Sequence, residues 1–382
     1  MKLLLIHNSY RIFGGEDSNI IDELNGLKTN FNVNYLEFSN KDNLSIFDFI
    51  FFILGYSFKG NKSIKNKIKE FNPDLIYVHN LWFRGGLGLF KIAKQKNIPV
   101  YVKIHNFRHE CSNFFLKKSH FNGNKVCPKC GNDYQKGLIN KYYDESLIKS
   151  IFLSVYSKRF IKKLKKYEVN IFALNSFHKK NLRNIFKNNK ISIVFNPITK
   201  TPQENNIYNS RSEYIIFAGR LVDSKGIVEL ISSWEKAKID NLDLYILGEG
   251  PLKKYVEKKS KELDNLIYLG FKQVPETIEY IKNSRAVVTA TKSYEGQPRF
   301  LTEASANSVP SIFPEYGGMS EYFPENYPLK FKQFDYGDLI SKLYFLENHE
   351  FLNKQSNLID DYIRKNLDRF NILNSIKKII SH

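Results

Sequence analysis

Short apolar runs alternate with longer amphipathic stretches along most of the chain. In the second half, the predicted strands are 214–218, 242–247, 266–271, 286–290 and 310–313. Helical patterns lie between them, at 226–236, 252–263, 275–283 and 298–307. Because buried strands that alternate with helices form parallel sheets covered on both faces, this pattern predicts a doubly wound α/β domain.

The first half shows the same alternation less sharply. Its predicted strands are 3–7, 33–38, 73–79, 100–105, 171–175 and 191–195. Its predicted helices are 16–27, 92–96 and 147–166. Residues 106–150 are irregular, and we expect them to form an insertion or lid near the edge of the sheet.

A segment rich in Pro and Asn, residues 196–206, separates the two halves and marks a domain boundary. We therefore predict an N-terminal Rossmann-like domain over 1–198 and a C-terminal one over 206–365. The final segment, 351–382, is predicted to be helical, and its part from 366 to 382 is expected to form a C-terminal helix that could pack back on the first domain.

Polar residues at strand ends are the candidates for a site, because such sheets bind ligands at the carboxyl edge of their strands. Glu295 and Glu303 flank a Gly-Gln-Pro turn after the strand 286–290. A carboxylate can accept hydrogen bonds from two adjacent hydroxyls of a ribose or hexose. By themselves, the two residues could equally be a capping and a solvated glutamate.

Two further loops follow strands in the same half. Arg220 and Lys225 lie between a strand and a helix, where a diphosphate would gain two cations and a helix N-terminus. Gly248, in the segment Leu-Gly-Glu-Gly-Pro, would let a nucleobase approach the backbone closely. A plain surface loop and an ordinary turn are the alternatives.

In this order the three motifs resemble the C-terminal domain of retaining family-4 glycosyltransferases with the GT-B fold, in which two Rossmann-like domains face each other across a cleft. The resemblance covers residues 214–322 and includes Gly317-Gly318 with Glu321. It implies that Arg220 and Lys225 bind the diphosphate of a nucleotide sugar. The implied donor-site residues also include Gly248, Glu295 on the sugar, Gly296, Gln297, Pro298, Arg299, and Glu303 on the ribose.

The first half is similar to the family at two places. Gly14 and Gly15, after the first strand, correspond to a glycine loop whose backbone amides face the donor phosphate or the acceptor. His105, at a strand end, corresponds to a polar catalytic residue beside the transferred sugar. His79 has the same setting. A tight turn and structural histidines remain the alternatives.

The implied reaction moves a hexose from a nucleotide sugar, with UDP favoured over GDP, to a hydroxyl with retention of configuration. The expected acceptor is an oligosaccharide or lipid-linked saccharide in bacterial surface polysaccharide synthesis, as in lipopolysaccharide or capsule. No Asp-x-Asp ends a strand, so catalysis is expected to need no metal cofactor. The alternatives are a nucleotide-sugar epimerase or a non-catalytic sugar- or membrane-binding subunit.

The chain of 382 residues has a formal net charge of +19. No clustered basic module typical of nucleic-acid binding is evident, so we expect no nucleic-acid partner. Attraction to an anionic membrane, attraction to an anionic substrate and a solvated Lys-rich surface remain open as explanations of the charge.

Residues 1–7 do not resemble a signal peptide, and we expect a cytoplasmic protein, peripheral on the inner face of the plasma membrane. The apolar run 44–58 is too short to span a bilayer, and reads as a buried or membrane-leaning helix.

The three cysteines, Cys111, Cys127 and Cys130, lie in the irregular segment. The Cys-Pro-Lys-Cys spacing suits tetrahedral zinc, and His109 or His120 would supply a fourth ligand. A structural zinc ion, free thiols and a redox role are the alternatives.

Overall fold

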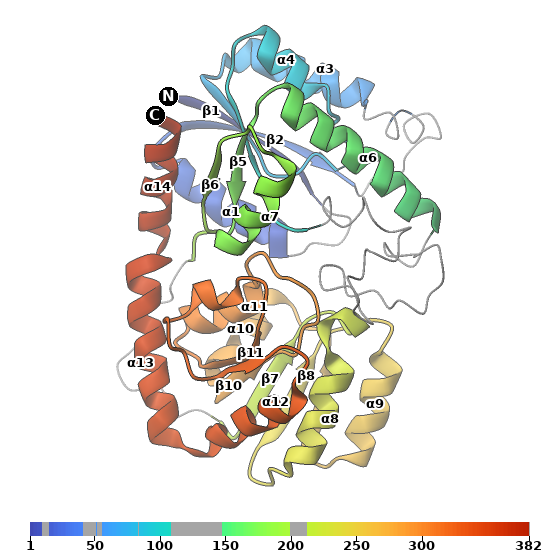
Figure 1. Ribbon diagram of the computed structural model, residues 1–382, viewed down its shortest axis with the longest axis vertical. Helices are drawn as coiled ribbons and strands as arrows, with labels where there is room; N and C mark the ends of the chain where they lie inside the picture. The colour runs from blue at the N-terminus through green and yellow to red at the C-terminus, as the bar shows by residue number, and fades with distance from the viewer. Residues whose placement is uncertain are drawn as a thin grey trace. The chain divides into compact units, whose positions relative to one another are not determined.

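The computed structural model describes residues 1–9, 15–40, 51, 56–82, 84–107, 147–198 and 212–381. These residues form two compact units, each built on a parallel six-stranded sheet (Figure 1). Unit 1 contains the described residues up to Pro197 and from Arg369 onward, and unit 2 contains those from Ile198 to Asp368. The predicted α/β class with two Rossmann-like domains is confirmed.

The sheet of unit 1 has the strand order β2-β1-β3-β4-β5-β6. Its strands are β1 (Lys2–Ser9), β2 (Asn32–Ser39), β3 (Leu75–Val78), β4 (Val100–Lys103), β5 (Asn170–Ala173) and β6 (Ile191–Ile193). The order reverses at β1, with β2 on one side and β3 on the other, so the point between β1 and β3 is where ligands bind in such sheets.

The two faces of this sheet bury alternate residues of each strand. Leu3 and Leu5 of β1 share a core with α1 (Gly15–Leu27) and α14 (Arg369–Ser381). Leu4 and Ile6 pack on the opposite face, in a core with the remaining helices of the unit. These are α3 (Phe58–Phe71), α4 (Leu89–Gln95), α6 (Leu147–Lys166) and α7 (Ser176–Ile185).

The sheet of unit 2 has the order β12-β11-β10-β7-β8-β9, which read backwards is the common Rossmann order. Its strands are β7 (Tyr214–Ala218), β8 (Asp243–Leu247), β9 (Leu266–Gly270), β10 (Ala286–Val288), β11 (Ser311–Glu315) and β12 (Lys330–Lys332). The chain leaves β7 and β10 in opposite directions along the sheet. Their carboxyl ends therefore flank the switch point at which a nucleotide would bind.

Helices cover this second sheet. They are α8 (Ile227–Ala237), α9 (Lys253–Glu262), α10 (Val274–Asn283), α11 (Arg299–Ala306), α12 (Tyr336–Leu343) and α13 (His349–Asn366). Helix α8 contacts α12, and α11 contacts both α10 and α13. Short 3-10 turns lie at Asp223–Lys225, Met319–Tyr322 and Tyr344–Glu347.

The C-terminal segment 351–382 is helical, as predicted, and it consists of two helices. Helix α13 ends at Asn366, and α14 begins at Arg369. Between them, the amide of Ile198 donates to the carbonyl of Leu367, and Ile198 pairs with Asp368 in an isolated parallel bridge. This extended pairing breaks the helix where the chain passes from unit 2 back to unit 1.

Four elements were not predicted: α3, α7, α12 and β12. Helix α3 buries only Ile64 and Ile68 among its aliphatic residues, and its other positions are mostly Lys and Asn. So sparse an apolar stripe gives a weak helical period. Most of the apolar run 44–58 lies outside the described residues.

Candidate functional site

The loops after β7 and β10 are joined to each other at the switch point of unit 2. The amide of Lys292 donates to the carbonyl of Ser224 at 2.9 Å, and the Thr291 hydroxyl donates to the same oxygen at 3.3 Å. The loop after β7 thus runs beside the loop after β10, and α8 begins directly after it.

Two glycines let the loop after β7 lie close to the loops after β10 and β8. Gly226 has φ 68°, and a Cβ there would lie 1.9 Å from the carbonyl oxygen of Ala290. Gly248 has φ 139°, and a Cβ there would lie 1.8 Å from the carbonyl oxygen of Gly219. Both positions require glycine, because a side chain would collide with backbone in a conformation that L-residues rarely adopt.

Lys225 and Glu295 form an ion pair at this junction. The Lys225 ammonium donates to Glu295 Oε1 at 2.5 Å, and the Thr291 hydroxyl donates to the same oxygen at 3.3 Å. The two side chains are 31% and 21% exposed, so both can reach a ligand. Arg220 is exposed nearby in sequence, in the loop that leaves β7. One strand edge therefore holds a cation and a carboxylate in contact.

Helix α11 carries the second glutamate one turn from its start. Glu303 pairs with Arg299 on the same helix. The hydroxyl of Tyr322 donates to the carbonyl of Gly296 at 2.7 Å and supports the turn before the helix. Gln297 and Pro298 complete that turn, and Pro298 is the N-cap. Arg299 thus contacts Glu303 directly.

Sequence reasoning missed Lys292. Its ammonium donates to Asp223 at 2.8 Å and to Glu229 at 2.9 Å, and its side chain is only 6% exposed. Burial lowers the pKa of Lys292, but the hydrogen bonds to the two carboxylates outweigh burial and raise it overall. Lys292 ties the loop that carries Lys225 to the start of α8. The available signal was a lysine in the short loop that follows the apolar strand β10.

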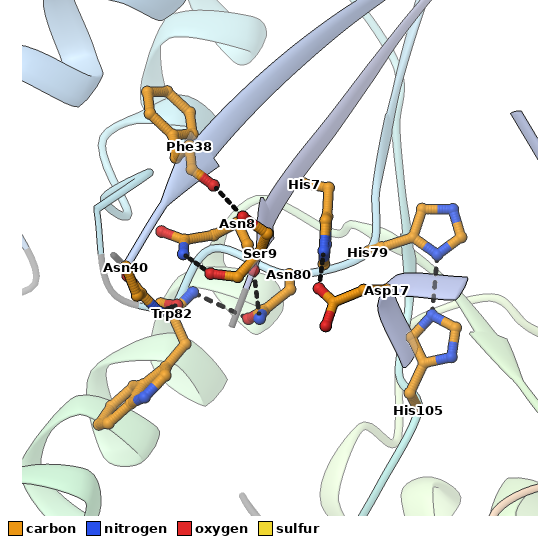
Figure 2. A network of polar contacts seen from close by, with 10 residues as sticks. All are labelled: His7, Asn8, Ser9, Asp17, Phe38, Asn40, His79, Asn80, Trp82 and His105. Carbon is orange, nitrogen blue, oxygen red and sulfur yellow. Dashed lines mark hydrogen bonds and ion pairs between the residues drawn. The ribbon is translucent and has the colours of Figure 1, made fainter. Parts of the chain in front are cut away.

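The carboxyl edge of unit 1 is a network of polar groups that includes several asparagines and histidines and the carboxylate of Asp17 (Figure 2). The Asn8 side chain accepts from the amide of Arg84 at 2.7 Å. The Asn80 amide group donates to the carbonyl of Asn8 at 2.9 Å and accepts from the amide of Trp82 at 2.9 Å. These bonds hold the end of β1 against the loop after β3.

Three histidines lie in β1 or shortly after β3 and β4. His7 lies in β1, and its Nε2 is 2.9 Å from Asp17 Oδ1 of α1. His79 follows β3, His105 follows β4, and His79 Nδ1 is 2.8 Å from His105 Nε2. Burial, with the charge of neighbouring Lys103, lowers the pKa of both His79 and His105 well below the usual value. Both rings are therefore neutral near pH 7.

A buried charged group lies within the sheet of the same unit. Lys103 donates to Glu23 at 2.8 Å, and both side chains are fully buried. The Tyr77 hydroxyl donates to the other carboxylate oxygen at 2.6 Å, and Lys103 also donates to the carbonyl of Phe195 at 3.1 Å. The group joins α1, β3 and β4 below the histidines.

Several predicted site residues lie outside the described part of the chain: Gly14, His109, Cys111, His120, Cys127 and Cys130. Gly15 is the first residue of α1. Among the described residues, no group of three or more His, Cys, Asp or Glu side chains is placed to hold a metal ion. The zinc hypothesis therefore stays a prediction.

Known proteins are similar to this chain in sequence and in fold. Residues 198–365 match the family described as "Glycosyl transferases group 1". Staphylococcus aureus CapJ is 26% identical over 241 residues, which cover 61% of this chain and 55% of CapJ. Staphylococcus aureus TarM superimposes with a TM-score of 0.60 at 16% identity, over 84% of this chain and 58% of TarM. Anabaena HepE superimposes with a TM-score of 0.65 at 12% identity, over 100% of this chain and 99% of HepE.

The family match falls on the second unit. The protein contains a group 1 glycosyltransferase domain, and its two Rossmann-like domains are those of the GT-B fold. The chain spans about half the length of CapJ.

Proposed function

We propose that the protein is a retaining glycosyltransferase of the family-4 type that moves a hexose from a UDP-sugar to an oligosaccharide or lipid-linked acceptor. The observation that carries the proposal is the Lys225–Glu295 pair at the switch point of a group 1 glycosyltransferase domain. TarM and HepE have been crystallised with UDP, and HepE also with UDP-glucose. The similarity to CapJ supports a role in capsule or other surface polysaccharide synthesis.

The pair suggests how the donor is held. A nucleotide sugar presents a diphosphate that suits Lys225 and the exposed Arg220, and hydroxyls that suit Glu295. Donor binding would then exchange the Lys225–Glu295 bond for bonds to the ligand. Glu303, now paired with Arg299, would accept from the ribose hydroxyls.

The chemistry follows from this placement. The bond between the anomeric carbon and the diphosphate oxygen breaks, and the acceptor oxygen bonds to the carbon on the same face. The acceptor's proton passes to the departing phosphate oxygen. Lys225, Arg220 and the start of α8 stabilise the negative charge that develops on the leaving group.

A donor screen tests the proposal. UDP-sugars should raise the midpoint of thermal unfolding more than GDP-sugars, because a ligand that binds the folded state stabilises it. With an acceptor present, NMR of the product should show the anomeric configuration of the donor. Conversion of the donor without an acceptor would show an epimerase instead. Tight sugar binding without any conversion would show a binding subunit.

We also propose that unit 1 holds the enzyme against an anionic membrane. Its described residues contain 27 Lys and Arg against 8 Asp and Glu, whereas those of unit 2 contain 20 against 24. Within unit 1 the charge is divided between the faces of the sheet. Helix α1 has four acidic and no basic residues, whereas α3, α4 and α6 on the other face are rich in lysine.

The exposed lysines of those three helices define what we call the basic face. They are Lys59, Lys62, Lys65, Lys69, Lys91, Lys94, Lys158, Lys162, Lys165 and Lys166. Figure 1 shows α3, α4 and α6 over the same side of the sheet. Tyr56 and Phe58, at the start of α3, are 42% and 59% exposed, and their rings pack edge to face. Aromatic side chains beside lysines suit the headgroup region of a bilayer. Within the described residues, no helix is long and apolar enough to cross a membrane.

Vesicle flotation tests this second part. The protein should float with vesicles containing phosphatidylglycerol and not with pure phosphatidylcholine vesicles. The triple variant Lys65→Glu, Lys94→Glu, Lys162→Glu should weaken binding at least ~100-fold, at about 1 kcal/mol per basic residue. The control Lys236→Glu, Lys254→Glu, Lys261→Glu makes the same charge change at exposed positions of unit 2. Equal losses in both variants would contradict a localised docking face.

A further inference from the structure

His79 is buried between the ring of Tyr77 and that of His105. Its side chain is 5% exposed, and its ring centroid lies 4.6 Å from that of Tyr77 and 5.0 Å from that of His105. Figure 2 shows the two histidine rings meeting edge to edge, with His79 Nδ1 toward His105 Nε2. The other ring nitrogen of His79, Nε2, is buried and has no hydrogen-bond partner.

Two arrangements of hydrogens fit the neutral pair. If His105 Nε2 donated the shared hydrogen, the hydrogen of His79 would lie on Nε2, as a buried N–H without an acceptor. If His79 Nδ1 donates, only a lone pair at Nε2 is left unsatisfied. Buried N–H groups without a partner are rarer than unsatisfied acceptors. The second arrangement is therefore favoured, and it leaves the hydrogen of His105 on Nδ1.

We propose that His79 is a positioning residue, whose Nδ1–H holds His105 as the Nδ1–H tautomer. His105 then offers a hydrogen-bond donor at the carboxyl end of β4. Among the described residues, nothing pairs with this nitrogen. The Nδ1–H of His105 can donate a hydrogen bond to an oxygen, such as that of a sugar hydroxyl or a phosphate. A protonated Nδ1 cannot act as a general base. The role in turnover rests on the proposed function, whereas the tautomer does not.

The tautomer can be measured directly. In protein labelled with ¹⁵N-histidine, the shifts of the ring nitrogens distinguish a protonated from an unprotonated nitrogen, and His105→Asn assigns the signals. At pH 7.5 we expect His105 to be protonated on Nδ1 and unprotonated on Nε2. A wild-type His105 that carries its hydrogen on Nε2 would overturn the proposal.

Two substitutions separate this role from packing. His79→Phe keeps a ring against Tyr77 but removes the donor, so His105 should shift toward the Nε2–H tautomer. His79→Asn keeps a donor near the position of Nδ1, and should retain the wild-type signals. If His79→Phe left the His105 signals unchanged, His79 would not control the tautomer.

Kinetics supply the second readout. His79→Phe should lower kcat about tenfold, the effect of one uncharged hydrogen bond, with little change in the KM for the donor. His79→Asn should keep most of the activity. Equal losses in both variants, with equal losses of thermal stability, would assign His79 a structural role only. Absence of transfer by the wild type would refute the proposed function and leave the NMR result standing.

Discussion

The two sheets carry opposite kinds of polar groups at their carboxyl edges. In unit 2 the groups are charged and reach solvent, as with Lys225 and Glu295. In unit 1 many of them are uncharged amides and imidazoles, as with His79 and His105. The carboxylate of Asp17 is buried against His7, and the charges of Glu23 and Lys103 are buried within the sheet. Under the proposed function the difference follows from the ligands. A diphosphate needs cations, whereas a sugar hydroxyl needs donors and acceptors without net charge.

The chain offers a probe for each side of this comparison. It has two tryptophans, Trp82 in unit 1 and Trp234 in unit 2, both buried. Trp234→Phe leaves a fluorophore that reports on unit 1, and Trp82→Phe leaves one that reports on unit 2. Each stability measurement below uses the matching single-tryptophan protein as its reference.

The largest effect is expected at the buried charge of unit 1. Lys103→Met should lower the free energy of unfolding by about 3–5 kcal/mol, because Glu23 would remain buried without its cation. Urea unfolding followed through Trp82 measures this change. The double variant Lys103→Met, Glu23→Gln should recover a large part of the loss. If the single variant were as stable as its reference, the ion pair would not stabilise the unit.

The next effect concerns the charged pair of unit 2. Lys225→Ala and Glu295→Gln should each lower the rate of transfer by roughly 10²–10³-fold, because each removes charged contacts to the donor. The double variant should lose less than the product of the two, since the residues contact each other. Lys236→Ala, at an exposed position, is the control. Near wild-type turnover in either variant would contradict the assigned donor site.

The third prediction is the pH dependence of unit 1. Burial lowers the pKa of His178 to about 3, and lowers the pKa of His79 and His105 as well. The unfolded chain protonates these rings near pH 6.5, whereas the folded chain does not. The stability is therefore complete above about pH 6.5 and falls toward pH 3, by about 1.4 kcal/mol per pH unit and histidine.

Urea unfolding between pH 7 and pH 5, followed through Trp82, measures this slope. His178→Phe should reduce the pH dependence of the free energy of unfolding by the contribution of one histidine. The same titration through Trp234 serves as the control, because His349, the one histidine among the described residues of unit 2, is exposed. A slope in unit 1 that does not change in His178→Phe would exclude that residue as a cause.

The smallest effect is expected at Lys292. Its partners Asp223 and Glu229 are 58% and 22% exposed, so water can replace the lost cation. Lys292→Met should cost only about 1 kcal/mol of stability in unit 2. It should raise the KM for the donor several-fold, because the loop that carries Lys225 loses its tie to α8. If Lys292→Met lowered the stability of unit 2 as much as Lys103→Met lowers that of unit 1, the two units would not differ in their dependence on a buried lysine.

The local sequence indicated candidate site residues where a single loop carries several polar or charged side chains. The segments 217–226 and 293–303 each combine glycines with charged residues after an apolar strand, and the structure joins them through Lys225 and Glu295. The helix α3 could not be predicted in this way, because it has too few apolar residues. Nor could the bridge between Ile198 and Asp368, because it joins residues that are distant in sequence.

The sequence by itself determined the α/β class, the division into two halves and the candidate donor loops, because strand and helix periods and loop composition are local properties. Only the tertiary structure decided which polar residues meet. His79 and His105 are separated by 26 positions, and Lys103 and Glu23 by 80. Their pairing depends on the order of β1, β3 and β4 in the sheet and on the burial that this order creates. No local pattern of residues encodes either property.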